Sequence, residues 1–204
     1  FRNVSHFAAT VGWYTAVTLL PLAEVFAIEF TTPVWVALLA VLFLGEKMNL
    51  GRVVALVLGI AGILVILRPG FTDVGAGTWM MVATAFGFAI ANVCTKGLTP
   101  TDSILTVLLW MSMLQGLMAV VGASFEWTAP IVVEIPWLIV VGVSGLAAHY
   151  SLAKALTLAD VSLVNPVDFL RLPLIAVVGF LAYGEGVDVL VLVGAGLIFV
   201  GNYY

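Results

Sequence analysis

Charged residues are scarce in this chain. Only 9% of its 204 residues are charged and 63% are apolar, with a mean hydropathy of +1.23. A soluble domain has about a quarter of its residues charged, so a chain of this composition cannot cover a water-exposed surface. A soluble cytosolic enzyme is therefore excluded. Intrinsic disorder is excluded as well, because it requires low hydrophobicity and high charge.

Basic residues, cysteine and histidine are also few. Seven Lys+Arg against eleven Asp+Glu give a net charge of -4, which excludes a basic nucleic-acid footprint, and no nucleic-acid partner is expected. The single cysteine, Cys94, excludes an internal disulfide or a cysteine-based metal site. His6 and His149 are too far apart in sequence to suggest a metal site. No nucleophile–base motif or phosphate loop is present, so we predict no catalytic residues, no metal, no cofactor and no enzymatic activity.

What the sequence has instead is a series of long apolar stretches. Each is long enough to cross about 30 Å of hydrocarbon, and turn residues separate them. The fold class predicted is an all-α polytopic membrane protein. The eight predicted spans are Val4–Leu20, Pro21–Leu44, Gly51–Arg68, Gly77–Lys96, Ser103–Ala123, Ile135–Lys154, Val161–Ala182 and Val187–Tyr204.

The distribution of basic residues predicts the orientation. Arg2, Lys47, Arg52, Lys96 and Lys154 fall on one side of the predicted topology, whereas the other side has Arg68 alone. By the positive-inside rule the first side is cytoplasmic. Both ends of the chain are then expected in the cytoplasm, and the chain itself in the cell (inner) membrane as a multi-pass protein.

The first three spans and the last three are related as an internal repeat. Placing Gly45-Glu46 on Gly184-Glu185 gives 14 identities in the 58 positions from residue 8 to 65. Each span of the second copy comes an odd number of spans after its counterpart, which predicts opposite orientations, a construction common in secondary transporters. The two spans between residues 77 and 123 have no counterpart upstream. We therefore expect a ten-helix protein of which two helices precede this chain.

Glycines and helix joints are given structural roles. Small residues allow helices to approach closely, and we expect this at Gly59/Gly62, Gly142/Gly145 and Gly194/Gly196. Glu46 and Glu185 follow glycines at helix joints, where we expect them to cap the ends of neighbouring helices rather than to bind substrate.

Several motifs carry a family resemblance. Pro21 to Glu24, Gly45-Glu46-Lys47 and Arg68-Pro69-Gly70 resemble the EamA repeat of the drug/metabolite transporter superfamily. The second copy, from Asn165-Pro166 to Tyr183-Gly184-Glu185, is similar to the branch that includes S-adenosylmethionine uptake transporters. The resemblance implies two inverted five-helix repeats and transport or exchange of small metabolites without ATP. Residues 1–70 would be the last three helices of the first repeat, and residues 77–204 the complete second repeat.

Charged residues inside a span are costly and are functional candidates. Arg171 lies about ten residues into its span, hence on the order of 15 Å deep, and Asp168 is one turn away. A guanidinium there can hold a substrate carboxylate bidentately; the alternative is a structural ion pair. Asn165, beside Pro166, adds polar character to the same span.

Glu29 is the repeat counterpart of Asp168. It has no basic residue one turn away, and a carboxylate in a low-dielectric surrounding takes up a proton more readily. The alternative is a carboxylate held by Thr31 or Thr32, or by a group on another helix. Pro33 and Pro173 break the two equivalent spans at similar places, which points to a binding site between them or to ordinary packing kinks.

Three further candidates come from the helices expected to line the same cavity. Trp13 and Tyr14 are placed in the first span and His149 in the sixth, where packing roles are the alternative. Together these residues predict a secondary transporter for a small polar metabolite, amino-acid-like or nucleoside-like, working by alternating access, with proton coupling or exchange left open. A non-transporting membrane assembly or sensor component is the alternative. The expected partners are that substrate and the lipid bilayer, with monomer and homodimer both left open.

Overall fold

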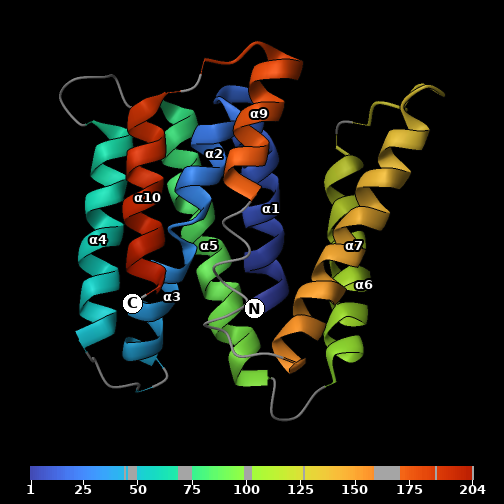
Figure 1. Cartoon of the computed structure of the whole chain (residues 1–204). Coiled ribbons are helices and arrows are strands. Elements are labelled where there is room, and N and C mark those ends of the chain that lie inside the picture. Colours follow the sequence, from blue (N-terminus) through green and yellow to red (C-terminus); the bar gives the residue numbers. More distant parts are fainter. Residues whose placement is uncertain are drawn as a thin grey trace. The chain divides into compact units, whose positions relative to one another are not determined.

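Helices form all of the regular structure in the described part of the chain. The computed structural model describes residues 1–43, 45, 50–68, 75–98, 103–125, 127–158, 171–186 and 188–203. The helices (Figure 1) are α1 (Arg2–Leu19), α2 (Leu22–Glu29), α3 (Thr32–Phe43), α4 (Leu50–Leu67), α5 (Ala76–Leu98), α6 (Ile104–Ala123), α7 (Ile135–Leu158), α9 (Arg171–Tyr183) and α10 (Val189–Tyr203).

The helices follow the predicted spans closely, with one departure. The predicted span Pro21–Leu44 is divided into α2 and α3. Of the predicted span Val161–Ala182, the second half is α9 and residues 161–170 lie outside the described residues. Among the described residues, three stretches are long and apolar enough to cross a membrane, namely Leu22–Phe43, Ala76–Thr95 and Ile104–Ala123, and shorter apolar stretches lie in α4, α7, α9 and α10. These helices make the chain a multi-pass membrane protein.

The chain divides into two compact units. The first contains Phe1–Gly97 and Asn165–Tyr204, and the second contains Leu98–Val164. In the first unit, α2 lies at the centre, where Val25, Ala27 and Ile28 are fully buried and where it packs against α1, α4, α9 and α10. The short helix α2 is thus the core of this unit.

Glycines bring α4 and α10 together backbone to backbone. An added Cβ at Gly62 would lie 2.6 Å from the backbone oxygen of Gly194, and one at Gly194 would lie 2.7 Å from that of Gly62. At the other end of the pair, Gly201 would meet the backbone of Ala55 at 3.2 Å. The two helices are therefore antiparallel, as Figure 1 shows for the teal and red ribbons. The predicted close approach at Gly62 and Gly194 is confirmed.

At three other glycines of the set, the described residues show no close approach. Among the described residues, an added Cβ at Gly196 would have no atom within 4 Å. Neither would one at Gly142 or Gly145, which belong to α7 in the second unit. Small residues allow close approach but do not enforce it, because the neighbouring helix decides which face of α10 is used.

The alignment that relates the two sequence segments also relates their helix ends. In the register that matches Gly45 with Gly184, the start of α3 at Thr32 falls on the start of α9 at Arg171. The start of α4 at Leu50 likewise falls on the start of α10 at Val189. Gly45 and Gly184, which follow α3 and α9, have φ angles of +66° and +67°. Glycine adopts this left-handed conformation without the steric cost that a side chain would add, so the two segments end corresponding helices in the same way.

Candidate functional site

Among the described residues of the first unit, the break between α2 and α3 brings polar groups into a stretch long and apolar enough to cross a membrane. Pro33 has no N–H, so the backbone oxygen of Glu29, four residues earlier, loses its helical partner. The hydroxyl of Thr32 donates to that oxygen at 2.6 Å instead. The hydroxyl of Thr31 likewise donates to the backbone oxygen of Ile28 at 2.7 Å. The two threonines therefore stabilise an open helix end in the apolar core.

The Glu29 side chain is held at this break by an indole. Nε1 of Trp13 on α1 donates a hydrogen bond to Oε2 of Glu29 at 2.6 Å. A donor at that distance is typical of a charge-assisted hydrogen bond. Glu29 is the eighth residue of α2, which places it about 12 Å from the start of that helix. The sequence left open whether the Glu29 carboxylate is held by Thr31 or Thr32 or by a group on another helix, and the structure shows Trp13 of α1 as such a group.

Aromatic rings surround the indole. Trp13 makes edge-on contacts with Phe26 of α2, at 5.6 Å between ring centroids, and with Tyr14 at 5.4 Å. Tyr14 is half exposed. Trp13, Tyr14 and Glu29, which the sequence singles out, thus lie together. The sequence reasoning did not identify Phe26. Its position one helical turn before Glu29 was the pattern that could have indicated its place in the cluster. We call Trp13, Tyr14, Phe26 and Glu29 the aromatic–carboxylate cluster.

The other predicted site residues are placed less fully. Arg171 is the first residue of α9, a helix that packs against α2, but its side chain lies outside the described part of the structure. Asp168 and Asn165 lie outside the described residues. His149 is on α7 in the second unit, which is described by itself. The structure therefore brings together the candidates on α1 and α2.

A second set of polar contacts lies where α2 begins. Oε2 of Glu185, in the turn after α9, accepts a hydrogen bond from the backbone N–H of Leu22 at 2.9 Å. Glu24, in the first turn of α2, accepts one from the hydroxyl of Thr78 on α5 at 3.3 Å. The prediction that Glu185 caps a neighbouring helix end is confirmed. The sequence offered it only as a general expectation, because Leu22 lies in the other repeat segment.

An ion pair ties α4 to α10 at the same end. The Arg68 guanidinium donates to Oδ2 of Asp188, and Oδ1 of Asp188 accepts from the backbone N–H of Leu190 at 2.9 Å. Asp188 therefore also caps α10. The hydrogen bond from Arg68, followed by that from Leu190, lowers the pKa of the Asp188 carboxyl below its ordinary value of 3.8.

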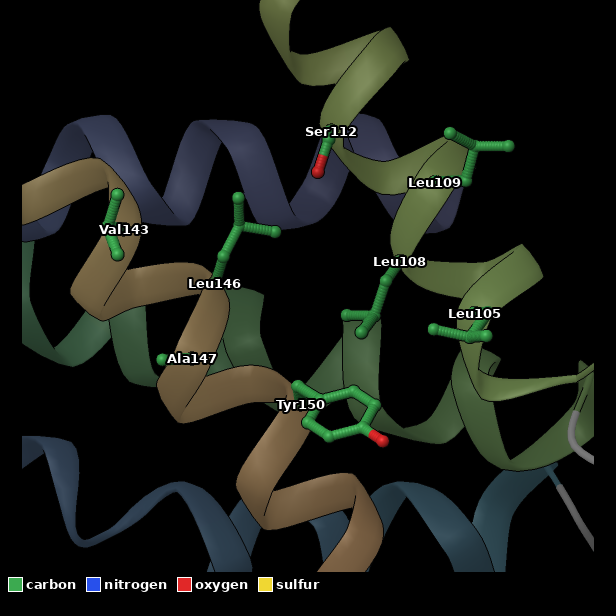
Figure 2. A pocket seen from close by; sticks show the side chains of 8 residues that line it. All are labelled: Leu105, Leu108, Leu109, Ser112, Val143, Leu146, Ala147 and Tyr150. Atoms are coloured by element: carbon green, nitrogen blue, oxygen red, sulfur yellow. The ribbon is translucent and has the colours of Figure 1, made fainter. Parts of the chain in front are cut away.

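The second unit contains an open apolar groove between α6 and α7. Figure 2 shows its lining, in which the only polar side-chain groups among the labelled residues are the hydroxyls of Ser112 and Tyr150. Leucine side chains of α6 and Val143, Leu146 and Ala147 of α7 form the rest. A surface of this kind suits hydrocarbon and offers few partners to a polar metabolite. We therefore place the candidate site at the aromatic–carboxylate cluster.

The apolar helices define this chain as a multi-pass membrane protein. In its first unit, a stretch long enough to cross a membrane is broken beside a carboxylate. The chain belongs to the EamA-like transporter family, whose model matches residues 3–68 and 75–204. This family match makes it a transporter-family protein, in agreement with the resemblance found in its motifs.

Several curated relatives are named as transporters of S-adenosylmethionine or of riboflavin. The S-adenosylmethionine uptake transporter of Rickettsia bellii (strain RML369-C) is 25% identical over 197 residues, covering 97% of this chain and 68% of the relative. The riboflavin transporter of Brucella anthropi is 30% identical over 198 residues, covering 94% of this chain and 70% of the relative. The riboflavin transporter of Vibrio cholerae is 29% identical over 184 residues, covering 87% of this chain and 61% of the relative. No solved structure matches the chain significantly.

Proposed function

We propose that this chain forms the substrate pathway of a secondary transporter for a small polar metabolite that is amino-acid-like or nucleoside-like. The transporter works in the inner membrane by alternating access, with both ends of this chain in the cytoplasm. The family match and the transporters named among the relatives support this proposal. The charge bias across the predicted spans supports the orientation.

One observation carries the proposal at the level of residues. The hydrogen bond between Trp13 and Glu29 holds a carboxylate at a helix break within the stretch Leu22–Phe43. Discontinuous helices form substrate sites in transporters because their free ends offer polar backbone groups in mid-membrane. A carboxylate beside aromatic rings can bind an amino group or another cation and can contact a planar heterocycle. S-adenosylmethionine and riboflavin both contain a planar nitrogen heterocycle.

Three residues of the second segment complete the proposed site. Arg171 begins α9, which packs against α2, and its guanidinium would bind a substrate carboxylate bidentately. Asp168 and Asn165 precede it in the sequence and would add an acceptor and an amide. The repeat alignment makes Asp168 the counterpart of Glu29, so the two carboxylates would serve opposite halves of the transport path.

Uptake into proteoliposomes tests the function directly. S-adenosylmethionine and riboflavin, each radiolabelled, serve as probes, with counterflow and an imposed pH gradient as separate driving conditions. Saturable uptake of either probe, competed by the unlabelled compound, is the expected result. Binding to the protein without uptake in either condition would favour the alternative of a sensor or assembly component.

A Glu29→Gln variant tests whether that carboxylate carries the coupled proton. Glutamine mimics the protonated form, so accumulation driven by the pH gradient should be lost while exchange remains measurable. Glu134→Gln is the matched control, since Glu134 is exposed beside α7 and its carboxylate accepts a hydrogen bond only from its own turn among the described contacts. Full gradient-driven uptake by Glu29→Gln would assign the proton to another residue or make the protein a simple exchanger.

A further inference from the structure

The first turn of α2 depends on an acceptor from a distant part of the chain. A helix begins with backbone N–H groups that have no partner inside the helix. The residue before α2 is Pro21, which provides no side-chain cap. Glu185 provides it instead, by accepting from the Leu22 N–H, and a carboxylate also interacts favourably with the positive end of the helix dipole.

The turn that carries Glu185 is shaped to deliver the carboxylate to α2. Gly184 takes a left-handed conformation with φ of +67°, and the Glu185 N–H donates to the backbone oxygen of Gly179 at 3.0 Å. An added Cβ at Gly179 would lie 2.5 Å from Oε2 of Glu185. Only glycine leaves room for the carboxylate in this position.

This hydrogen bond crosses between the two repeat segments. Leu22 belongs to the segment before residue 70 and Glu185 to the segment after residue 77. In alternating access one repeat rocks against the other, so a contact between them at one end of the pathway, away from the helices on which they pivot, breaks when that end opens. The Arg68–Asp188 pair also crosses between the segments at this end, but it joins α4 and α10, whose backbones are already in contact.

We infer that Glu185 acts as a latch, which keeps the pathway closed at the end of the first unit where α2 begins. Its carboxylate accepts a hydrogen bond from the Leu22 N–H and occupies the space that Gly179 leaves by having no side chain. The inference rests on the proposed transport function, because a latch requires a protein that opens. By the charge bias, this is the end expected to face outside. α2 spans only eight residues, with the latch at its first residue and Glu29 at its last, so release of the latch frees the helix that carries the site carboxylate.

Thiol labelling reports the opening without any substrate. Val25 is fully buried on α2, one turn from Leu22, so Val25→Cys in a Cys94→Ala background places a reporter behind the latch. With a charged thiol reagent, Glu185→Ala should label about fivefold faster than the parent, the effect of losing one helix cap. Glu185→Gln keeps a neutral acceptor and should be intermediate. Gly179→Ala should displace the carboxylate and label as fast as Glu185→Ala.

Two further comparisons decide the outcome. Adding Gly179→Ala to Glu185→Ala should have no further effect, because both changes remove the same contact. Gly196→Ala, a glycine in α10 with open space around it among the described residues, should label like the parent. A purely structural cap would lower the melting temperature of Glu185→Ala and leave its labelling rate unchanged well below that temperature, and this result would overturn the latch. Failure of metabolite uptake would instead reject the proposed function, which is measured separately.

Discussion

Replacing Trp13 by phenylalanine isolates the hydrogen bond at the centre of the candidate site. The ring that contacts Phe26 and Tyr14 is largely kept, while the Nε1 donor 2.6 Å from Oε2 of Glu29 is removed. The carboxylate then loses a partner that fixes its orientation at the helix break. We therefore expect Trp13→Phe to weaken binding of a substrate that Glu29 recognises, with little change in the fold.

The magnitude follows from the kind of hydrogen bond. Bonds to a charged group contribute about 1.5–3 kcal/mol net, and about 1.4 kcal/mol corresponds to a tenfold change in affinity. If orientation of Glu29 accounts for the lower part of that range, the half-saturation concentration for uptake should rise about tenfold. Initial rates in proteoliposomes over a range of S-adenosylmethionine or riboflavin concentrations measure this change.

A matched tryptophan separates the site from a general effect on the membrane protein. Trp79 on α5 is 60% exposed, so Trp79→Phe removes an indole N–H away from the cluster and should leave the half-saturation concentration unchanged. Melting temperatures of both variants check the fold. An affinity for Trp13→Phe within twofold of the parent, for a probe that the parent transports, would refute the reasoning that Trp13 positions Glu29.

Two other predictions concern stability. Gly62→Ala should lower the melting temperature by the equivalent of about 1–3 kcal/mol, because its Cβ would meet a backbone oxygen of α10 at 2.6 Å. Gly196→Ala, the control, should leave the melting temperature unchanged. Equal losses of melting temperature in both variants would contradict the packing described for α4 and α10. Asp188→Asn should destabilise by less than about 1 kcal/mol, since the pair is partly exposed. Because the folded-state pKa of Asp188 is lowered, this contribution is present above about pH 4 and disappears as the pH falls through the lowered pKa. A difference in melting temperature between parent and Asp188→Asn that persists unchanged at a pH low enough to protonate the Asp188 carboxyl in the folded protein would contradict it.

The sequence predicts the helices well because each one is set by a local property. Long apolar runs determine where spans lie, and Gly, Pro and charged residues determine where they end. Pro33 also predicts a break, but the structure shows where it falls: α2 ends at Glu29, one helical turn before the proline. The reason is physical, since proline removes the partner of the carbonyl four residues earlier and its ring crowds that carbonyl.

The site is only partly predictable because it depends on contacts between distant segments. Trp13 and Glu29 are each recognisable as polar groups in apolar surroundings, but their hydrogen bond depends on the rotation of α1 about its axis. The cap that Glu185 gives to Leu22 depends on the packing of α9 against α2. Neither rotation nor packing is encoded in a local pattern, so the sequence supplied the candidates and the structure supplied the pairs.

The internal repeat shows the same division between local and distant requirements. Only 14 of 58 aligned positions are identical, yet two pairs of helix starts share one register. Most positions in a membrane-spanning helix need only an apolar side chain, so Ala, Val, Leu and Ile can replace one another at little cost in transfer energy. Gly45 and Gly184 differ in this respect, because a φ near +66° is costly for any residue with a Cβ. The identity at Gly45 and Gly184 therefore marks a place where the backbone favours one residue, and this place, rather than the overall identity, carries structural information of the repeat.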